Sequence, residues 1–326
     1  MNCLGEGVIM KLKLDKKYLQ NGFVIALLAL FACCLWGSAF PSIKLGYRMF
    51  HIAEEDIYGK MLFAGVRFFI SGCMVFLFSF ACKISVKVTK EQFVKLLMLG
   101  ILQTSLQYFF FYIGMANTSG TTGSILSSLA TFFSVLLAPC FFPSDRLSVR
   151  KIAGVVVGFA GIIILNYQGA TSAFRLNGEG FIIISSAVSA FASIYTKKLT
   201  ELKIHSVLIS AYQLLLGGLF LGMTGFIGNG GEFLAITLSG SLLLIYMGFI
   251  SAAAFSIWTI LLSYNSVGAI SIYKFSIPLF GSLLSFLILN ERNLNLSVLF
   301  SMIFVAAGIL LINFQSKSID KKKIRE

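Results

Sequence analysis

Long runs of apolar residues recur along the whole chain, each separated from the next by a short polar or charged segment. Ten of these runs approach the roughly 20 residues that an α-helix needs to cross about 30 Å of hydrocarbon. They predict transmembrane helices at residues 21–45, 60–82, 92–115, 119–142, 150–168, 178–197, 205–227, 238–262, 268–289 and 296–314. We therefore expect an all-α polytopic membrane protein with ten transmembrane helices.

The composition agrees, since 57% of the residues are hydrophobic and only 12% are charged, which is far from soluble globular usage. The first apolar run follows a basic stretch, as in a signal peptide, but it is too long and contains Trp36 and Pro41 in place of a cleavage site. We expect a retained helix. The six cysteines show no metal-ligand spacing, so we expect no disulfide framework, no bound metal and no cofactor.

The distribution of charge predicts how the chain is oriented. If the N-terminus is cytoplasmic, 19 of the 26 Lys and Arg fall in cytoplasmic segments, four fall in external loops and three remain in the membrane. This is the positive-inside bias, so the net charge of +13 reports orientation in a lipid bilayer and not a nucleic-acid partner. We expect a multi-pass protein of the plasma (inner) membrane with cytoplasmic termini at 1–20 and 315–326.

The two halves of the chain resemble each other. GMANTSG at 114–120 parallels LSYNSVG at 262–268, and GIIILNYQ at 161–168 parallels GILLINFQ at 308–315. These matches predict two five-helix repeats at 21–168 and 178–314, and because five is odd the second repeat enters the membrane from the opposite side. Two inverted five-helix repeats indicate alternating access around a midplane site. The alternative is a duplicated bundle without a pathway.

Polar residues follow one face of four predicted helices at three- and four-residue spacing. They are Gln103, Thr104, Gln107, Tyr108 and Tyr112 in the third helix, Ser124, Ser127, Ser128, Thr131 and Ser134 in the fourth, Ser185, Ser186, Ser189, Ser193 and Thr196 in the sixth, and Ser271, Lys274, Ser282 and Ser285 in the ninth. One such stripe is typical of helix packing, but four favour a wet central cavity. The pairs Gly154/Gly158 and Gly218/Gly222 predict packing seams, and the pattern is too common to indicate a homodimer.

Lys274 lies inside the apolar run GAISIYKFSIPLFGSLLSFLILNER, where a charge costs roughly 2.5–3.5 kcal/mol on insertion scales. It lies about six residues, or roughly 9 Å, from the cytoplasmic end of its helix, so snorkelling to the interface is one reading. Pro278 favours a cavity role, since it leaves the Lys274 carbonyl without its helical donor. Pro41 does the same for Gly37, and helix breaks of this kind mark transporter sites.

Arg67, in AGVRFFISG, is the second intramembrane candidate. It is read either as an anion contact or as a structural partner of Glu54, Glu55 or Asp56 on the preceding loop. All 13 acidic residues lie outside the predicted helices or at their ends. The membrane cations therefore favour a substrate with a carboxylate or phosphate. The predicted helices offer no acid/base pair or activated nucleophile, which disfavours an enzyme.

Several motifs together resemble a known family. They are WGSAFPSIK in the first helix, an arginine in the second, fourth helices that run into Asp145 and Glu291, and above all YKFSIPLFGSLLSFLILNER. Over about residues 20–315 the chain resembles the EamA-type drug/metabolite transporter superfamily. The resemblance implies a central cavity lined by the first four helices of each repeat, with peripheral fifth helices. It also implies export of amino acids, related metabolites or toxic organic compounds, whereas relatives exchange sugar phosphates or nucleotide sugars.

The chain departs from the family pattern at Ala130, near an expected proline, and at PSDR 143–146, which replaces an apolar-glycine-glutamate ending. Our prediction is an alternating-access exporter of small metabolites, amino acids or related carboxylates first. The alternatives are an organic phosphate or nucleotide-sugar antiporter and a non-transporting membrane scaffold or receptor. The predicted substrate-binding residues are Trp36, Ser38, Arg67, Tyr108, Tyr112, Ser128, Tyr273 and Lys274, and the predicted helix breaks are Gly37, Pro41 and Pro278.

Overall fold

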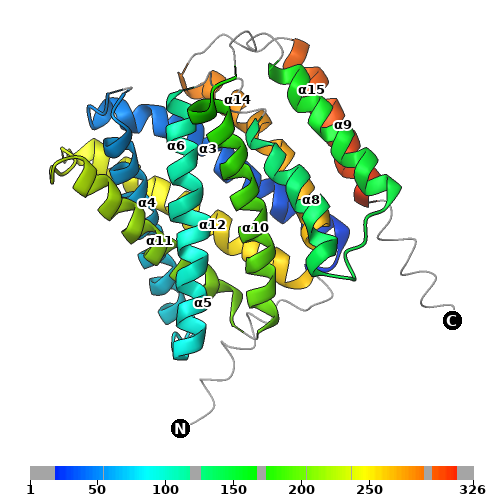
Figure 1. Ribbon diagram of the computed structural model, residues 1–326, viewed down its shortest axis with the longest axis horizontal. Coiled ribbons are helices and arrows are strands. Elements are labelled where there is room, and N and C mark those ends of the chain that lie inside the picture. Colours follow the sequence, from blue (N-terminus) through cyan, green and yellow to red (C-terminus); the bar gives the residue numbers. More distant parts are fainter. Residues whose placement is uncertain are drawn as a thin grey trace.

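A computed structural model describes residues 19–53, 55–117, 126–166, 174–202, 204–235, 237–289 and 296–313. Within these ranges the regular structure is entirely helical and forms one bundle (Figure 1). Its elements are α3 (Gly22–Met49), α4 (Ile57–Ala81), α5 (Lys90–Gly100), η1 (Ile101–Leu106), α6 (Gln107–Ala116), α8 (Leu129–Phe141), α9 (Val149–Asn166), η3 (Leu176–Gly180), α10 (Phe181–Glu201), α11 (Ser206–Gly228), α12 (Leu238–Tyr264), α13 (Val267–Ser271), η4 (Ile272–Phe275), α14 (Ser276–Leu289) and α15 (Leu296–Asn313).

These elements follow the ten predicted helices, and polar side chains mark several of their first turns. Asn21 accepts from the Phe23 amide at the start of α3, and Thr237 accepts from Gly240 at the start of α12. Thr89 and Gln92 form a reciprocal capping box at α5. Such caps satisfy amides that have no partner inside the helix. The helix ends are therefore set by local hydrogen bonding as well as by hydropathy.

Six helices in the described part of the chain are long and apolar enough to cross a membrane. They are Gly22–Met49, Ile57–Ala81, Lys90–Met115, Leu176–Glu201, Ser206–Gly228 and Leu238–Tyr264. Shorter apolar helices lie at Leu129–Phe141, Val267–Gly281 and Phe300–Leu311. Together with the strongly apolar sequence, these helices indicate a multi-pass membrane protein.

The helices pack in pairs that join the two halves of the chain. α4 packs along α11 at one edge of the bundle, and α9 packs along α15 at the opposite edge (Figure 1). Between these edges α3 packs on α12 and α14, while α10 packs on α6 and α8. α9 and α15 are therefore peripheral, as the family resemblance implies.

Glycines allow the closest of these helix contacts. A Cβ added at Gly65 of α4 would lie 2.2 Å from the Gly222 backbone of α11, and one at Gly218 would lie 2.5 Å from the Phe69 amide. At the other edge, a Cβ at Gly308 of α15 would lie 2.6 Å from the carbonyl oxygen of Gly154. The predicted packing seams at Gly154 with Gly158 and at Gly218 with Gly222 are confirmed, and both lie within this chain.

Among the described residues, three of the predicted helices change their winding, and the sixth does so near its start, where a π-helical segment, η3, continues into α10. The third passes from α5 through a π-helical segment, η1, into α6, and the ninth passes from α13 through a 3₁₀ segment, η4, into α14. Pro278 is the third residue of α14, where a missing amide hydrogen costs little. The Ser276 amide donates to the Tyr273 and Lys274 carbonyls. The prediction that Pro278 leaves the Lys274 carbonyl free is therefore wrong.

The predicted break at Gly37 and Pro41 is also corrected, because α3 runs through Pro41 without interruption. A single proline removes one backbone hydrogen bond, and neighbouring helices can hold the remaining turns in place. Gly37 serves packing instead, since a Cβ there would lie 2.5 Å from the Phe280 Cβ in α14.

Some predictions fall outside the described residues. These are the terminal segments 1–18 and 314–326, Ser124, Glu54, Glu291 and parts of both repeat motifs, and the described side chains do not include Ser282 or Ser285.

Candidate functional site

A central cavity of about 240 Å³ lies between the two halves. The helices around it are α3, α4, the third helix from η1 to α6, residues 127–131, α10, α11, α12 and the ninth helix from η4 to α14, and none of its described lining residues comes from α9 or α15. The edge helices thus hold the bundle together, while the inner helices enclose the cavity.

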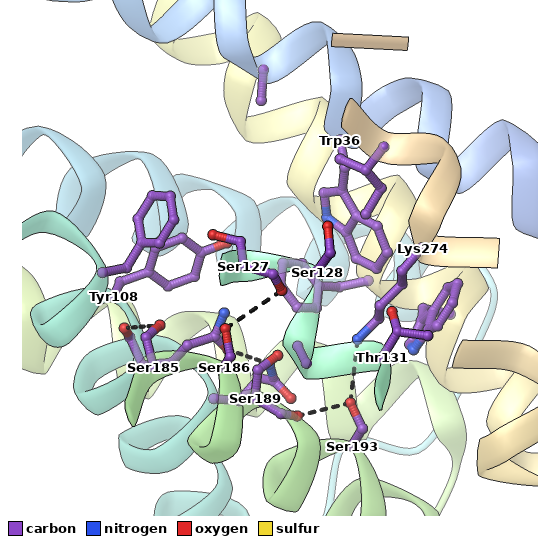
Figure 2. A pocket seen from close by; sticks show the side chains of 18 of the residues that line it. Trp36, Tyr108, Ser127, Ser128, Thr131, Ser185, Ser186, Ser189, Ser193 and Lys274 are labelled. Carbon is purple, nitrogen blue, oxygen red and sulfur yellow. Dashed lines mark hydrogen bonds between the residues drawn. The ribbon is translucent and has the colours of Figure 1, made fainter. Parts of the chain in front are cut away.

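One wall of the cavity is a row of hydroxyl side chains on α10 (Figure 2). Ser185 donates to the Gln107 carbonyl, and Ser186 donates to the Leu126 carbonyl, each at 2.9 Å. Ser193 donates to the Ser189 carbonyl one turn earlier, also at 2.9 Å. The first two bonds fasten α10 to neighbouring segments, the third lies within α10, and all these serines line the cavity. The serine stripe therefore serves both packing and the polar wall.

The facing wall is aromatic. The Trp36 ring of α3 lies 5.3 Å from Phe255 and 5.2 Å from Trp258 of α12, measured between centroids. Tyr108 lies 6.1 Å from Tyr112 and 4.7 Å from Phe68. Large rings at these separations make favourable tilted and edge-to-face contacts. The cavity thus has one hydroxyl face and one ring-lined face.

Lys274 extends into the cavity from η4. Its Nζ lies 5.0 Å from the Trp258 ring centroid and donates to the Ser193 hydroxyl at 3.4 Å. Figure 2 shows the ammonium between η4 and α10, beside Thr131. The snorkelling interpretation required the side chain to extend toward the end of the bundle. Instead it lies within the bundle, against Trp258 and Ser193. Cation–π contact with Trp258 offsets part of the cost of this location.

Arg67 lies on the α4 side of the cavity and is 3% exposed. Its Nε and Nη2 both donate to the Ser251 hydroxyl, at 3.1 and 3.0 Å, and its guanidinium lies 4.7 Å from the Phe68 ring centroid. Asp56, one of its predicted partners, instead caps α4 by accepting from the Gly59 amide. In the described part of the chain no carboxylate lies within 4 Å of Arg67 or Lys274.

The structure brings most of the predicted binding residues to one cavity. Those that line it are Trp36, Arg67, Tyr108, Tyr112, Ser128 and Lys274. Ser38 does not, because it lies on another face of α3, donates to the Leu35 carbonyl and faces the Tyr246 hydroxyl. Tyr273 is fully buried in a core cluster, about a third of a turn from Lys274. The substrate-binding role of the lining residues stays a prediction.

Trp258 and Gln213 also line the cavity, and the sequence analysis missed both. Trp258 lies in FSIWT and Gln213 in SAYQLLL, each with other polar residues nearby in a largely apolar helix. An amide or indole within a predicted transmembrane helix was the available signal. Within the described ranges, no group of three or more His, Cys, Asp or Glu side chains is arranged to hold a metal ion.

A group of polar contacts lies at one end of the bundle, which we call the basic end because Lys151 and Lys197 lie there. Asp145, 3% exposed, pairs with Lys151 and accepts from the Gly268 amide at 3.0 Å. Lys197 donates to the Ser263 carbonyl at 3.3 Å. These contacts join residues from both halves of the chain. The segment that begins at Gly268 continues directly into the turn that carries Lys274.

Comparison with known proteins agrees with this architecture. A sequence profile described as the EamA-like transporter family matches residues 23–167 and again residues 176–314. An uncharacterized transporter of Bacillus subtilis, YvbV, is 28% identical over 301 residues, which is 90% of this chain and 92% of that protein. A protein of Salmonella typhimurium named "Probable amino-acid metabolite efflux pump" is 24% identical and covers 83% of this chain and 88% of its own length.

A solved crystal structure has the same fold. It superimposes with a TM-score of 0.74 and covers 88% of this chain and 97% of its own, at 15% identity. At that identity the likeness concerns the fold alone. The arrangement of inner and edge helices is therefore not peculiar to this sequence.

Proposed function

Because this chain belongs to the EamA-like transporter family, we propose that it is an alternating-access exporter of small metabolites, with amino acids and related carboxylates as the first candidates. Family membership makes it a multi-pass membrane transporter. The observation that carries the substrate proposal is the central cavity, whose described wall holds two cations and no carboxylate. The relative named as an amino-acid metabolite efflux pump supports the same substrate group.

Alternating access in this proposal rests on two inverted five-helix repeats at 21–168 and 178–314. The family profile matches once in each of these ranges. The packing supports the same division, since α4 pairs with α11 and α9 pairs with α15, the second and the fifth helix of each half. A cavity between such halves can open to either side as they rock against each other.

The basic end of the bundle is cytoplasmic in our proposal, and the membrane is the plasma (inner) membrane. The proposal rests on the bias of Lys and Arg toward the linkers at that end, which is the usual determinant of orientation. Both termini are then cytoplasmic. Export would carry substrate from the basic end to the opposite face.

The electrostatics of the cavity support an anionic or zwitterionic substrate. Two cations without a neighbouring carboxylate make the cavity unfavourable for a cation, because like charges repel strongly in a low-dielectric site. A carboxylate or phosphate would neutralise them. The cavity of about 240 Å³ is smaller than the roughly 300–1,000 Å³ of pockets for drug-sized ligands, which favours small carboxylates over nucleotide sugars.

The test is efflux from proteoliposomes loaded with amino acids, organic acids and sugar phosphates, comparing the wild type with Lys274→Met. We expect release of anionic species to fall about tenfold or more in the variant, since a hydrogen bond to a charged group contributes about 1.5–3 kcal/mol. Lys198→Met, which removes an exposed cation from the same bundle, is the control. Equal release by wild type and Lys274→Met would remove Lys274 from the substrate path.

The same assay separates an exporter from an organic phosphate antiporter. Efflux is measured with and without a matching substrate pool outside the vesicles. Release that proceeds without the external pool supports the exporter. Release that requires it supports the antiporter, and sugar phosphates would then be the preferred load.

A further inference from the structure

The two cations of the cavity lie at opposite ends of one row of aromatic rings. The row runs from Arg67 through Phe68, Phe255, Trp36 and Trp258 to Lys274, with successive separations of 4.7, 6.3, 5.3, 5.2 and 5.0 Å between charged groups and ring centroids. Figure 2 shows the same arrangement, with Lys274 at one side of the cavity and Tyr108, which contacts Phe68, at the other. Each cation therefore contacts a different end of this row.

Each cation keeps hydrogen-bonding capacity for a ligand. The Lys274 ammonium has three N–H donors, and its hydrogen bond to Ser193 is long, at 3.4 Å. The Arg67 guanidinium has five donors, and both of its hydrogen bonds to described residues go to the single hydroxyl of Ser251. No carboxylate of the described residues lies within 4 Å of either group.

The wall between the two cations is uncharged. Serine hydroxyls of α10 line one side and the rings of Trp36, Phe255 and Trp258 line the other. Charges in such a site are poorly solvated, and each favours an anionic partner of its own. A ligand with one anionic group would neutralise one end only. A ligand with two separated anionic groups would neutralise both.

We propose that the cavity binds a dicarboxylate, an acidic amino acid included, with one carboxylate at Lys274 and the other at Arg67. This inference rests on the proposed function, because it names the substrate class of the same cavity. The carbon chain between the carboxylates lies against the aromatic wall of the cavity. Spacing of the two charges, and not total charge, then determines which metabolite fits.

The test uses the intrinsic fluorescence of the purified full-length protein in detergent. The chain has two tryptophans, and both belong to the row of rings, so emission reports directly on this cavity. The probes are glutarate, pentanoate and glycerol 3-phosphate. Glutarate carries two separated carboxylates, pentanoate carries one carboxylate, and glycerol 3-phosphate carries its two negative charges on a single phosphate. Glutamate and glutamine form a second pair that differs by one charged group.

We expect glutarate to bind about tenfold or more tightly than pentanoate, and glutamate more tightly than glutamine. Lys274→Met and Arg67→Met should each reduce glutarate affinity to about that of pentanoate. Arg67→Lys keeps the charge and should restore most of the preference, which covers the case in which Arg67→Met fails to fold. Lys198→Met is the control, and it should bind glutarate as the wild type does.

Equal affinities for glutarate and pentanoate would overturn the inference, as would tightest binding of glycerol 3-phosphate, which would point to a single phosphate site. The transport proposal fails separately. If glutarate binds as expected but no load leaves proteoliposomes, the dicarboxylate site stands and the exporter does not. If neutral amino acids are exported without any preference for two carboxylates, the exporter stands and the dicarboxylate site does not.

Discussion

Asp145 is a carboxylate buried at a point where the two halves of the chain meet. It is 3% exposed, pairs with Lys151 and accepts a hydrogen bond from the Gly268 amide. Lys151 also donates to the Arg146 carbonyl at 2.9 Å. Removing one member of a buried pair leaves the other charge and the amide without their partner. Asp145 is therefore a residue on which the basic end of the bundle depends.

We predict that Asp145→Ala lowers the free energy of unfolding by about 3–5 kcal/mol, the usual cost of breaking a buried pair. Asp145→Asn should cost less, because an amide oxygen can still accept from Gly268. Glu91→Ala is the control, since Glu91 forms an exposed pair with Lys95 within α5 and should show no measurable loss. Thermal unfolding in detergent measures all three variants. Equal losses for Asp145→Ala and Glu91→Ala would contradict the prediction.

The sequence predicted which types of residue line the cavity better than it predicted which side of each helix faces it. Trp36 and Lys274 line the cavity, whereas Ser38 and Tyr273, two positions and one position away, do not. Successive residues of a helix point about 100° apart, so neighbours in sequence face different partners. The face that meets the cavity is fixed by the packing of α3 against α12 and α14, which one helix alone cannot reveal.

Among the helices, α4 and α11 make the closest extended contact. Gly65 and Gly72 of α4 face the backbones of Gly222 and Leu215 in α11, and Gly225 of α11 faces the Leu62 backbone. Small residues at this spacing let two backbones approach within a membrane, where van der Waals packing drives association. The pair holds together one edge of the cavity-forming bundle.

We predict that Gly65→Ala lowers the free energy of unfolding by about 1–3 kcal/mol, the cost of overpacking a close contact. The added Cβ would lie 2.2 Å from the Gly222 backbone, so the helices must separate. Gly22→Ala, with no atom within 4 Å of the new Cβ, is the matched control. Thermal unfolding should separate the two variants. A loss no larger than that of Gly22→Ala would show that the seam can widen without cost.

The winding of individual helices could be predicted only in part. The change of winding in the ninth helix lies before Pro278, and Pro41 leaves α3 unbroken. The π-helical segment η1 carries no proline, and Ser105 within it donates to the Gly217 carbonyl of α11 at 2.9 Å. Such contacts between distant helices decide where a helix departs from α geometry, and they are not visible in local sequence.

For the molecule as a whole, the helix spans were readable from the sequence because the bilayer enforces them. Backbone polar groups in hydrocarbon must be satisfied within the segment, so apolar length predicts a helix. The cavity was predicted only as a consequence of polar stripes. Its aromatic wall was predicted only in part: Trp36, Tyr108 and Tyr112 were expected there, but Trp258 and Phe255 were not. Those two rings are ordinary core residues until α3 brings Trp36 against them, with the α10 hydroxyls opposite.

We predict that cysteines at positions 128, 189 and 274 react with a membrane-impermeant thiol reagent, in a background without the six native cysteines. These positions line the cavity, which a transporter must hydrate in at least one state. Val156→Cys on the outer face of α9, where Val156 is 54% exposed, is the lipid-facing control and should not react. Three unreactive cavity positions, with and without substrate, would support the non-transporting scaffold or receptor.

The contact between Asp145 and Gly268 also bears on how the chain is made. The two residues are 123 positions apart, so at about 5–20 residues per second a ribosome needs about 6–25 s to supply the second after the first. During that interval α4 has no α11 to pack against until α11 is synthesised, and α9 likewise lacks α15, its partner at the edge of the bundle. The first half therefore cannot reach its final packing before the second is inserted, and the chain matures as one unit at the end of synthesis.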